Sequence, residues 1–101
     1  MIVYKDNIPV ACGAFKEYSV NCVELKRIFV IKEKRQQGLA KLVIKELEVS
    51  AKNMGYKYAV LGTGKKQPEA TSLYKSIGYN ITQNYEPYVG NTNIVCMKKD
   101  L

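Results

Sequence analysis

An apolar stripe at helical spacing, placed between two strand-like runs, constrains the fold of this chain more than any other feature. From residue 39 to residue 54 the apolar side chains recur mostly three and four positions apart, which predicts a helix with one core-facing side. Residues 22–31 before it and 58–61 after it predict strands. Strands joined through one helix lie parallel in a sheet, so this region predicts a right-handed β-α-β unit. The stripe consists of Leu39, Leu42, Val43, Leu47, Ala51 and Met54.

Within that unit, local signals predict how each element ends. Ile28, Phe29 and Val30 form a continuously apolar run, which predicts burial on both faces of the sheet. Gly55 is placed to end the helix. The sequence Gly62-Thr63-Gly64 predicts the end of the strand that follows.

The N-terminal segment predicts a β-hairpin. Residues 1–4 and 8–15 are apolar runs on either side of Lys5-Asp6-Asn7, which has the composition of a turn. Residues 17–21 are mostly polar and predict a connector to the strand at 22–31.

The C-terminal segment predicts a second helix and two strands. Pro68 lies near the expected start of the helix, where its missing N–H costs least, and Gly78 lies at its end. Residues 79–82 and 92–97 predict strands. The order is therefore β-β-β-α-β-α-β-β, a mixed sheet of the α/β (α+β) class in a single domain over residues 1–101.

Composition excludes several kinds of chemistry. The chain has no histidine, so it cannot by itself form a Ser-His-Asp triad, a Cys-His dyad or a histidine-ligated zinc site, and no metal is expected. The three cysteines, Cys12, Cys22 and Cys96, are odd in number and widely spaced, which predicts buried free thiols. No apolar run is long enough to span a bilayer and no signal-peptide pattern opens the chain, so we expect a cytoplasmic protein that does not bind membranes.

The net charge of +7 favours an anionic partner. A phosphorylated cofactor and a nucleic acid both satisfy this condition, and eight tyrosines add to the second interpretation. Basic residues are spread along the chain, however, and no recognition helix, RNP motif or zinc finger is present, so nucleic-acid binding is the weaker hypothesis.

The turn before the first helix predicts a phosphate site. Arg35-Gln36-Gln37-Gly38-Leu39-Ala40 joins a strand to a helix N-terminus, where backbone N–H groups lack intrahelical partners and the helix dipole favours an anion. Gly38 lets a ligand approach closely, and Lys34, Arg35 and Lys41 add positive charge. The turn is neither a P-loop nor a Rossmann fingerprint, because it lacks the residues of both.

These residues resemble the GNAT superfamily of N-acetyltransferases along nearly the whole chain. Residues 35–40 fit the Gln/Arg-x-x-Gly-x-Gly/Ala signature of that superfamily. Residues 24–30 (ELKRIFV) look like its central strand, and residues 73–79 (LYKSIGY) look like its Leu-Tyr-x-x-x-Gly-Phe/Tyr helix end. Gln67-Pro68-Glu69-Ala70 occupies the place of Asn-x-x-Ala, with a longer amide side chain.

The resemblance implies an acetyl-CoA-dependent N-acetyltransferase that acts on a small-molecule or peptide amine without a metal. It implies a splayed central strand and a turn that holds the pyrophosphate of coenzyme A. Tyr74 matches the general acid that protonates the departing thiolate, and Glu24 matches the general base of some members. The implied cofactor-binding residues are Ile28, Phe29, Val30, Arg35, Gln36, Gln37, Gly38, Leu39, Ala40, Lys41 and Gln67.

Each implied role has a structural alternative. Glu24 could pair with Lys26 or Arg27 on a strand face, and Tyr74 could be a core aromatic residue. Tyr79, Tyr85 and Tyr88 could line an acceptor pocket or pack as surface aromatics, and Lys65-Lys66 could reach the coenzyme or be solvated. A second function hypothesis is a domain that binds acetyl-CoA as a sensor without catalysis.

The chain resembles a short form of the family, without the usual N-terminal strand and two helices. Those helices commonly form one wall of the acceptor site. The sequence therefore predicts the cofactor half of the site better than the acceptor half. It also predicts a homodimer, because a partner could cover the surface that those helices usually cover.

Overall fold

The computed structural model describes residues 1–31 and 38–101 of the chain. The elements follow the predicted order β-β-β-α-β-α-β-β. They are β1 (Ile2–Lys5), β2 (Ile8–Ser19), β3 (Cys22–Val30), α1 (Leu39–Asn53), β4 (Tyr58–Gly64), α2 (Pro68–Ser76), β5 (Asn80–Thr82) and β6 (Ile94–Asp100).

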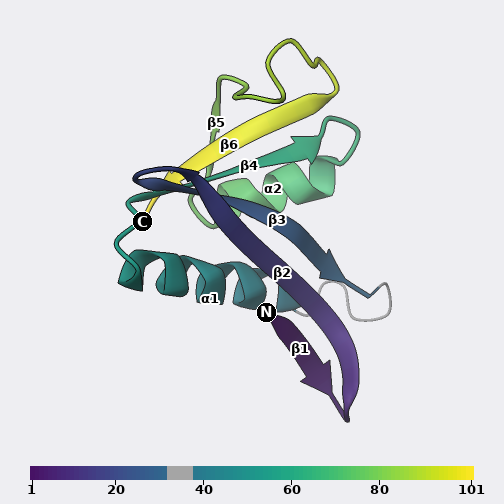
Figure 1. Ribbon diagram of the computed structural model, residues 1–101. Coiled ribbons are helices and arrows are strands. Elements are labelled where there is room, and N and C mark those ends of the chain that lie inside the picture. The colour runs from purple at the N-terminus through teal and green to yellow at the C-terminus, as the bar shows by residue number, and fades with distance from the viewer. Residues whose placement is uncertain (32–37) are drawn as a thin grey trace.

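Within the described residues the strands form one six-stranded mixed sheet in the order β1-β2-β3-β4-β6-β5 (Figure 1). β3 and β4 run parallel, and every other neighbouring pair runs antiparallel. This arrangement confirms the mixed α+β sheet and the parallel strands of the predicted β-α-β unit.

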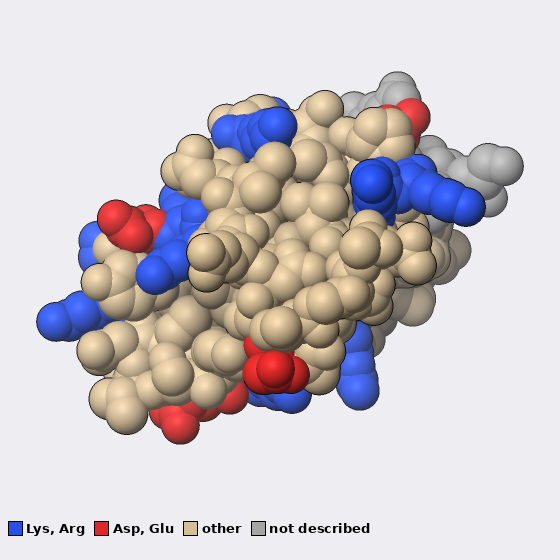
Figure 2. Space-filling model, turned by 90° about the horizontal axis from the view of Figure 1, so that it is seen from above, with Lys and Arg blue, Asp and Glu red and all other residues tan. Residues whose placement is uncertain are grey.

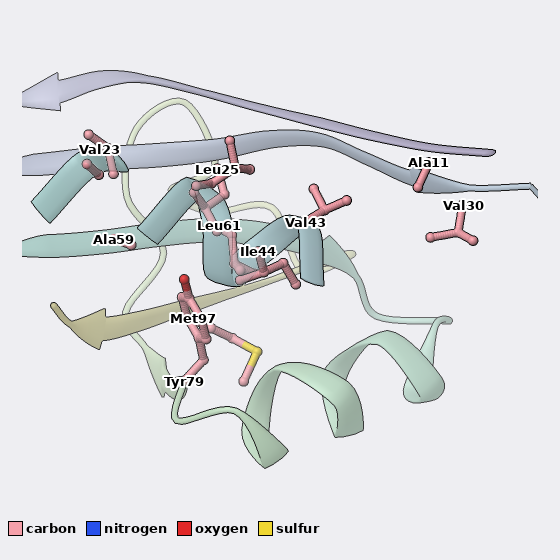
Figure 3. Packing of buried hydrophobic residues seen from close by; sticks show 12 residues of the cluster. Ala11, Val23, Leu25, Val30, Val43, Ile44, Ala59, Leu61, Tyr79 and Met97 are labelled. Atoms are coloured by element: carbon pink, nitrogen blue, oxygen red, sulfur yellow. The ribbon is translucent and has the colours of Figure 1, made fainter. Parts of the chain in front are cut away.

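Both helices pack against the same face of the sheet, which we call the helix face. Four residues of α1 enter the core there together with residues of β3, β4 and β6 (Figure 3). No residue of α2 is fully buried, but Tyr74 and Ile77, at its C-terminal end, pack against the same cluster. The buried residues of α1 are Val43, Ile44, Leu47 and Ala51.

The opposite face of the sheet, which we call the open face, carries the side chains between these core residues. Because strand side chains alternate, Glu24, Val60 and Cys96 lie there, each between two residues that pack against the helices. All three are buried nonetheless, so the open face is covered around them.

An extra residue interrupts β3 at Arg27, which has a left-handed backbone with φ of 59°. On one side of it Lys26 pairs with Ala14, and on the other side Phe29 pairs with Cys12. Three steps along β3 therefore match two steps along β2, which defines a β-bulge.

The bulge changes which alternate residues of β3 face the helices. Before it, Val23 and Leu25 enter the core, and after it Ile28 and Val30 do so. Phe29 then lies on the open face and is 52% exposed. The prediction that this apolar run is buried on both faces is wrong, because Phe29 alternates with Ile28 and Val30 and lies on the exposed side of the strand.

Three other expectations needed correction. β4 does not stop at Gly62, because residues 62–64 continue the ladder with β6. β2 continues to Ser19, so the expected connector is mostly strand. In α1, Leu42 and Met54 are exposed and Ile44 is buried, which rotates the core-facing stripe away from the predicted one.

The cysteine prediction is confirmed for Cys22 and Cys96, while Cys12 is half-buried, and all three are free.

Candidate active site

The two parallel strands separate part-way along their length. β3 pairs with β4 at residues 22–24, opposite residues 58–60. Beyond this point β4 continues with β6, and β3 continues with β2 as far as Val30. The strands diverge accordingly (Figure 1). The split begins at Glu24, so this residue occupies the point where the two strands part.

Glu24 is a buried carboxylate with three polar neighbours. Its side chain is 3% exposed. Oε1 lies 3.4 Å from Nζ of Lys26 and 3.9 Å from Nζ of Lys16. Oε2 accepts a hydrogen bond of 2.8 Å from the hydroxyl of Tyr85. A carboxylate is stable at such burial only when it is paired and hydrogen-bonded. The expected pairing with Lys26 is confirmed, and the catalytic role stays a prediction.

Two tyrosines of the segment between β5 and β6, together with one tyrosine of β2, cover Glu24 on the open face. The ring of Tyr85 contacts those of Tyr18 and Tyr88 edge-on, with centroids 4.9 and 5.4 Å apart. The ring of Tyr88 also lies close over Gly62, where an added Cβ would meet it at 3.1 Å. We call Tyr18, Tyr85 and Tyr88 the tyrosine cover.

Asn84 holds this segment in place. Its Nδ2 donates to the backbone carbonyls of Tyr88, Asn91 and Ile94 at 3.0, 3.0 and 3.2 Å. Three bonds from one amide tie the start of the segment to its end. The tyrosine cover is therefore part of the folded structure.

Burial first, and then the hydrogen bond to Glu24, raise the pKa of Tyr85 far above its usual value near 10. The hydroxyl therefore keeps its proton at neutral pH and acts as the donor.

Tyr79 does not belong to the site. It is 1% exposed, lies in the core, and donates its hydroxyl to Glu48 of α1 at 2.8 Å. The expectation that it lines an acceptor pocket or packs on the surface is wrong, since the chain after α2 turns inward at this residue.

The N-terminus of α1 has the features of an anion site in its described part. Gly38 has φ of 76°, and a Cβ there would meet nothing within 4 Å. Among the described residues no side chain caps the helix, and its first turn contains no acid. Leu39 and Ala40 are partly buried against the core, whereas Lys41 is exposed. Arg35, Gln36 and Gln37 lie outside the described residues.

The other predicted residues occupy two further places. Gln67 is the exposed N-cap residue of α2. Its backbone carbonyl accepts a hydrogen bond of 3.3 Å from the backbone N–H of Thr71. Tyr74 is partly buried and contacts the ring of Tyr79 edge-on at 6.0 Å, and burial raises its pKa. Tyr74 contacts the sheet from the helix face, whereas the side chain of Glu24 lies on the open face.

Two concavities lie elsewhere on the described surface. One of about 480 Å³ lies between β2 and α1 and includes Phe15 and Leu47, and one of about 430 Å³ lies beside β5 and β6. Neither is lined by a residue predicted for the site, so we assign the candidate site from the split and not from these hollows.

The comparisons with known proteins agree with this geometry. The model of the Acetyltransferase (GNAT) family matches residues 1–79, which include Glu24, residues 35–40 and Tyr74. The chain belongs to the GNAT acetyltransferase family.

Similar proteins are longer than this chain. An uncharacterized N-acetyltransferase of Schizosaccharomyces pombe is 33% identical over 106 residues, which cover 100% of this chain and 63% of that protein. A Klebsiella pneumoniae structure assigned as an acyl-CoA N-acyltransferase is 30% identical with a TM-score of 0.87, over 92% of this chain and 64% of that one. The chain thus spans less than two thirds of these relatives.

A GNAT family acetyltransferase from Elizabethkingia anophelis, solved with acetyl-CoA bound, shares the fold. It is 23% identical with a TM-score of 0.86, over 99% of this chain and 74% of that one. Among the described residues, neither helix has the length and apolar character that crossing a membrane requires.

Proposed function

We propose that the protein transfers the acetyl group of acetyl-CoA to a primary amine, by direct attack of the amine while both substrates are bound. The observation that carries the proposal is the position of Glu24. A buried carboxylate lies where the two parallel strands part, and α1 is the next described element after β3 in the chain. A proton acceptor and an anion site therefore belong to the same β-α-β unit.

The described part of the anion site fits a pyrophosphate. The open space at Gly38, the absence of an acid in the first turn and the exposed Lys41 all favour a negatively charged group. Backbone N–H groups of Gly38, Leu39, Ala40 and Lys41 would hold it, with Arg35, Gln36 and Gln37 before them. We assign Ile28, Phe29 and Val30 to the pantetheine arm and Gln67 to a further contact with the coenzyme.

Acetyl-CoA would supply the acetyl group as a thioester. Glu24 accepts a proton from the incoming ammonium, which frees the nitrogen lone pair to form the N–C bond. A backbone N–H of β3 stabilises the charge that develops on the carbonyl oxygen. Tyr74 gives its proton to the sulfur as the C–S bond breaks, and regains one from the nitrogen. The products are the N-acetyl amide, the free thiol and one proton released from Glu24.

The tyrosine hydroxyl suits this role. Burial raises the pKa of Tyr74, so the hydroxyl is protonated at neutral pH and can donate. Much of the remaining acceleration comes from holding the two substrates together.

Binding and turnover test the proposal separately. Acetyl-CoA at about 100 times its dissociation constant should stabilise the fold by roughly 2.7 kcal/mol, on the order of 10–20 °C in midpoint. A panel of primary amines should then release free thiol. A folded sample without a thermal shift at millimolar acetyl-CoA would contradict the proposal, and binding without thiol release on any amine would favour a sensor.

The side of the molecule away from α1 gives little support to nucleic-acid binding. Figure 2 shows the molecule from the side away from α1, where uncharged residues fill the middle and Lys and Arg stand at the margins. A nucleic-acid interface on this side would need a continuous basic surface.

A further inference from the structure

The two oxygens of Glu24 have different neighbours. Oε1 faces the ammonium groups of Lys26 and Lys16, at 3.4 and 3.9 Å. Oε2 accepts the 2.8 Å bond from Tyr85. The carboxylate is thus held from two sides, by cations along the sheet and by a neutral donor from the segment after β5.

These partners differ in how strongly they can fix the carboxylate. The side chains of Lys16 and Lys26 are 60% and 38% exposed, so water and salt screen their attraction. Tyr85 is partly buried, and its ring is packed between Tyr18 and Tyr88. A hydrogen bond to a charged group is strong and directional where water is excluded. The tyrosine therefore determines the orientation of Glu24 more than the lysines do.

We propose that Tyr85 is a positioning residue, whose hydroxyl aims the carboxylate of Glu24 into the split and keeps it ready to accept the proton of the amine. This inference rests on the proposed role of Glu24 as the base. A carboxylate has about four acceptor positions, so the bond from Tyr85 leaves positions free for an ammonium group. The tyrosine cover also limits access of water to the base.

The electrostatic surroundings predict the sign of the effect. The groups near Glu24 are Lys16 on β2, Lys26 and the Cys22 thiol on β3, and Tyr85. Tyr88 and the Cys96 thiol of β6 lie near Tyr85 in turn. A donor hydrogen bond favours the charged form of a carboxylate. Without the hydroxyl of Tyr85, the charged carboxylate should therefore be less well held, and proton transfer from the amine should be slower.

The decisive variant is Tyr85→Phe, assayed by thiol release with an accepted amine. It keeps the ring contacts and removes the bond to Oε2. We expect kcat/KM for the amine to fall about 10–100-fold, mainly through kcat, with the Kd of acetyl-CoA unchanged within about twofold. The matched control is Tyr18→Phe, because no hydrogen bond joins its hydroxyl to Glu24 in the described part of the chain. Its kcat/KM should stay at the wild-type value.

A double-mutant cycle separates this inference from the proposed function. If Tyr85 acts through Glu24, Tyr85→Phe should lower the rate little further in a Glu24→Gln background. Full additivity, or a wild-type kcat/KM in Tyr85→Phe, would overturn the inference alone. Wild-type rates in Glu24→Gln would overturn the proposed base, and the inference with it.

Thermal melting must show that the variants fold. If Tyr85→Phe does not fold, Glu24→Asp provides the test, because it keeps a carboxylate and withdraws it by one methylene from Tyr85. Its kcat/KM for the amine should fall, with the Kd of acetyl-CoA unchanged. A wild-type kcat/KM in that variant would count against the inference as well.

Discussion

The hydroxyl of Tyr79 donates a hydrogen bond of 2.8 Å to Oε2 of Glu48, and so joins the segment after α2 to α1. Oε1 of the same carboxylate is 2.9 Å from Nζ of Lys99 on β6. Glu48 therefore connects three parts of the chain at the edge of the core. Burial first, and then the charge of Glu48, raise the pKa of Tyr79 well above 10.

This relationship predicts how stability changes at alkaline pH. Because the pKa of Tyr79 is raised in the folded state, its contribution is complete below pH 10 and is lost as the pH rises further. Each such tyrosine adds a slope of up to about 1.4 kcal/mol per pH unit. Tyr79→Phe should therefore flatten the loss above pH 10, measured by urea unfolding at several pH values. Tyr74 and Tyr85, whose pKa values are also raised, should leave a residual slope.

A second prediction concerns the core-facing side of α1. Leu47→Ala should lower the free energy of unfolding by about 2–5 kcal/mol, since Leu47 is buried in the core cluster. Leu42→Ala is the matched control on the same helix, because Leu42 is 44% exposed, and its effect should stay within about 1 kcal/mol. Equal losses of unfolding free energy, measured with urea, would mean that Leu42 is buried like Leu47, as the apolar stripe in the sequence predicts.

The fold was predictable where periodicity and turn residues agree. Residues 22–61 show a strand, an amphipathic helix and a second strand, and the structure forms them with parallel pairing. The bulge at Arg27 was not predictable, because arginine gives no signal for a left-handed backbone. The extension of β4 through Gly62 and Gly64 was missed for another reason. Pairing with β6 outweighs the low strand propensity of glycine, and that pairing is not local in sequence.

The candidate site was predictable residue by residue but not in its contacts. Glu24 and Tyr85 were both singled out from the sequence, yet 61 positions separate them, and no local pattern joins them. Lys16 was missed because its relation to Glu24 follows from the register of β2 against β3. Tyr79 was misplaced since the sequence does not show that the chain turns into the core after Gly78.

A third prediction tests the anion site. Gly38→Val places a β-branched residue at a positive φ, and its side chain would stand where the pyrophosphate is proposed to bind. Gly55→Val is the matched control at the other end of α1, with φ of 95° and equally open surroundings. Both should lose similar stability, about 1–2 kcal/mol. Calorimetry should show a loss of acetyl-CoA affinity of at least about tenfold in Gly38→Val, and near wild-type affinity in Gly55→Val. Equal affinities would remove Gly38 from the site.

The last prediction concerns the proposed general acid. Tyr74→Phe removes one hydroxyl and keeps the ring that packs on Tyr79, so the fold should persist. If the hydroxyl protonates the departing thiolate, kcat should fall by roughly 10²–10⁴, while the Kd of acetyl-CoA hardly changes because the proton transfer belongs to the transition state. Tyr79→Phe is the control on the same face: its hydroxyl is bound to Glu48, so kcat should stay at the wild-type value. Thiol release and calorimetry measure both quantities. A wild-type kcat in Tyr74→Phe would exclude Tyr74 as the acid. An equal fall in kcat in both variants would also remove the support for this role, because both rings are kept and the hydroxyl of Tyr79 is bound to Glu48.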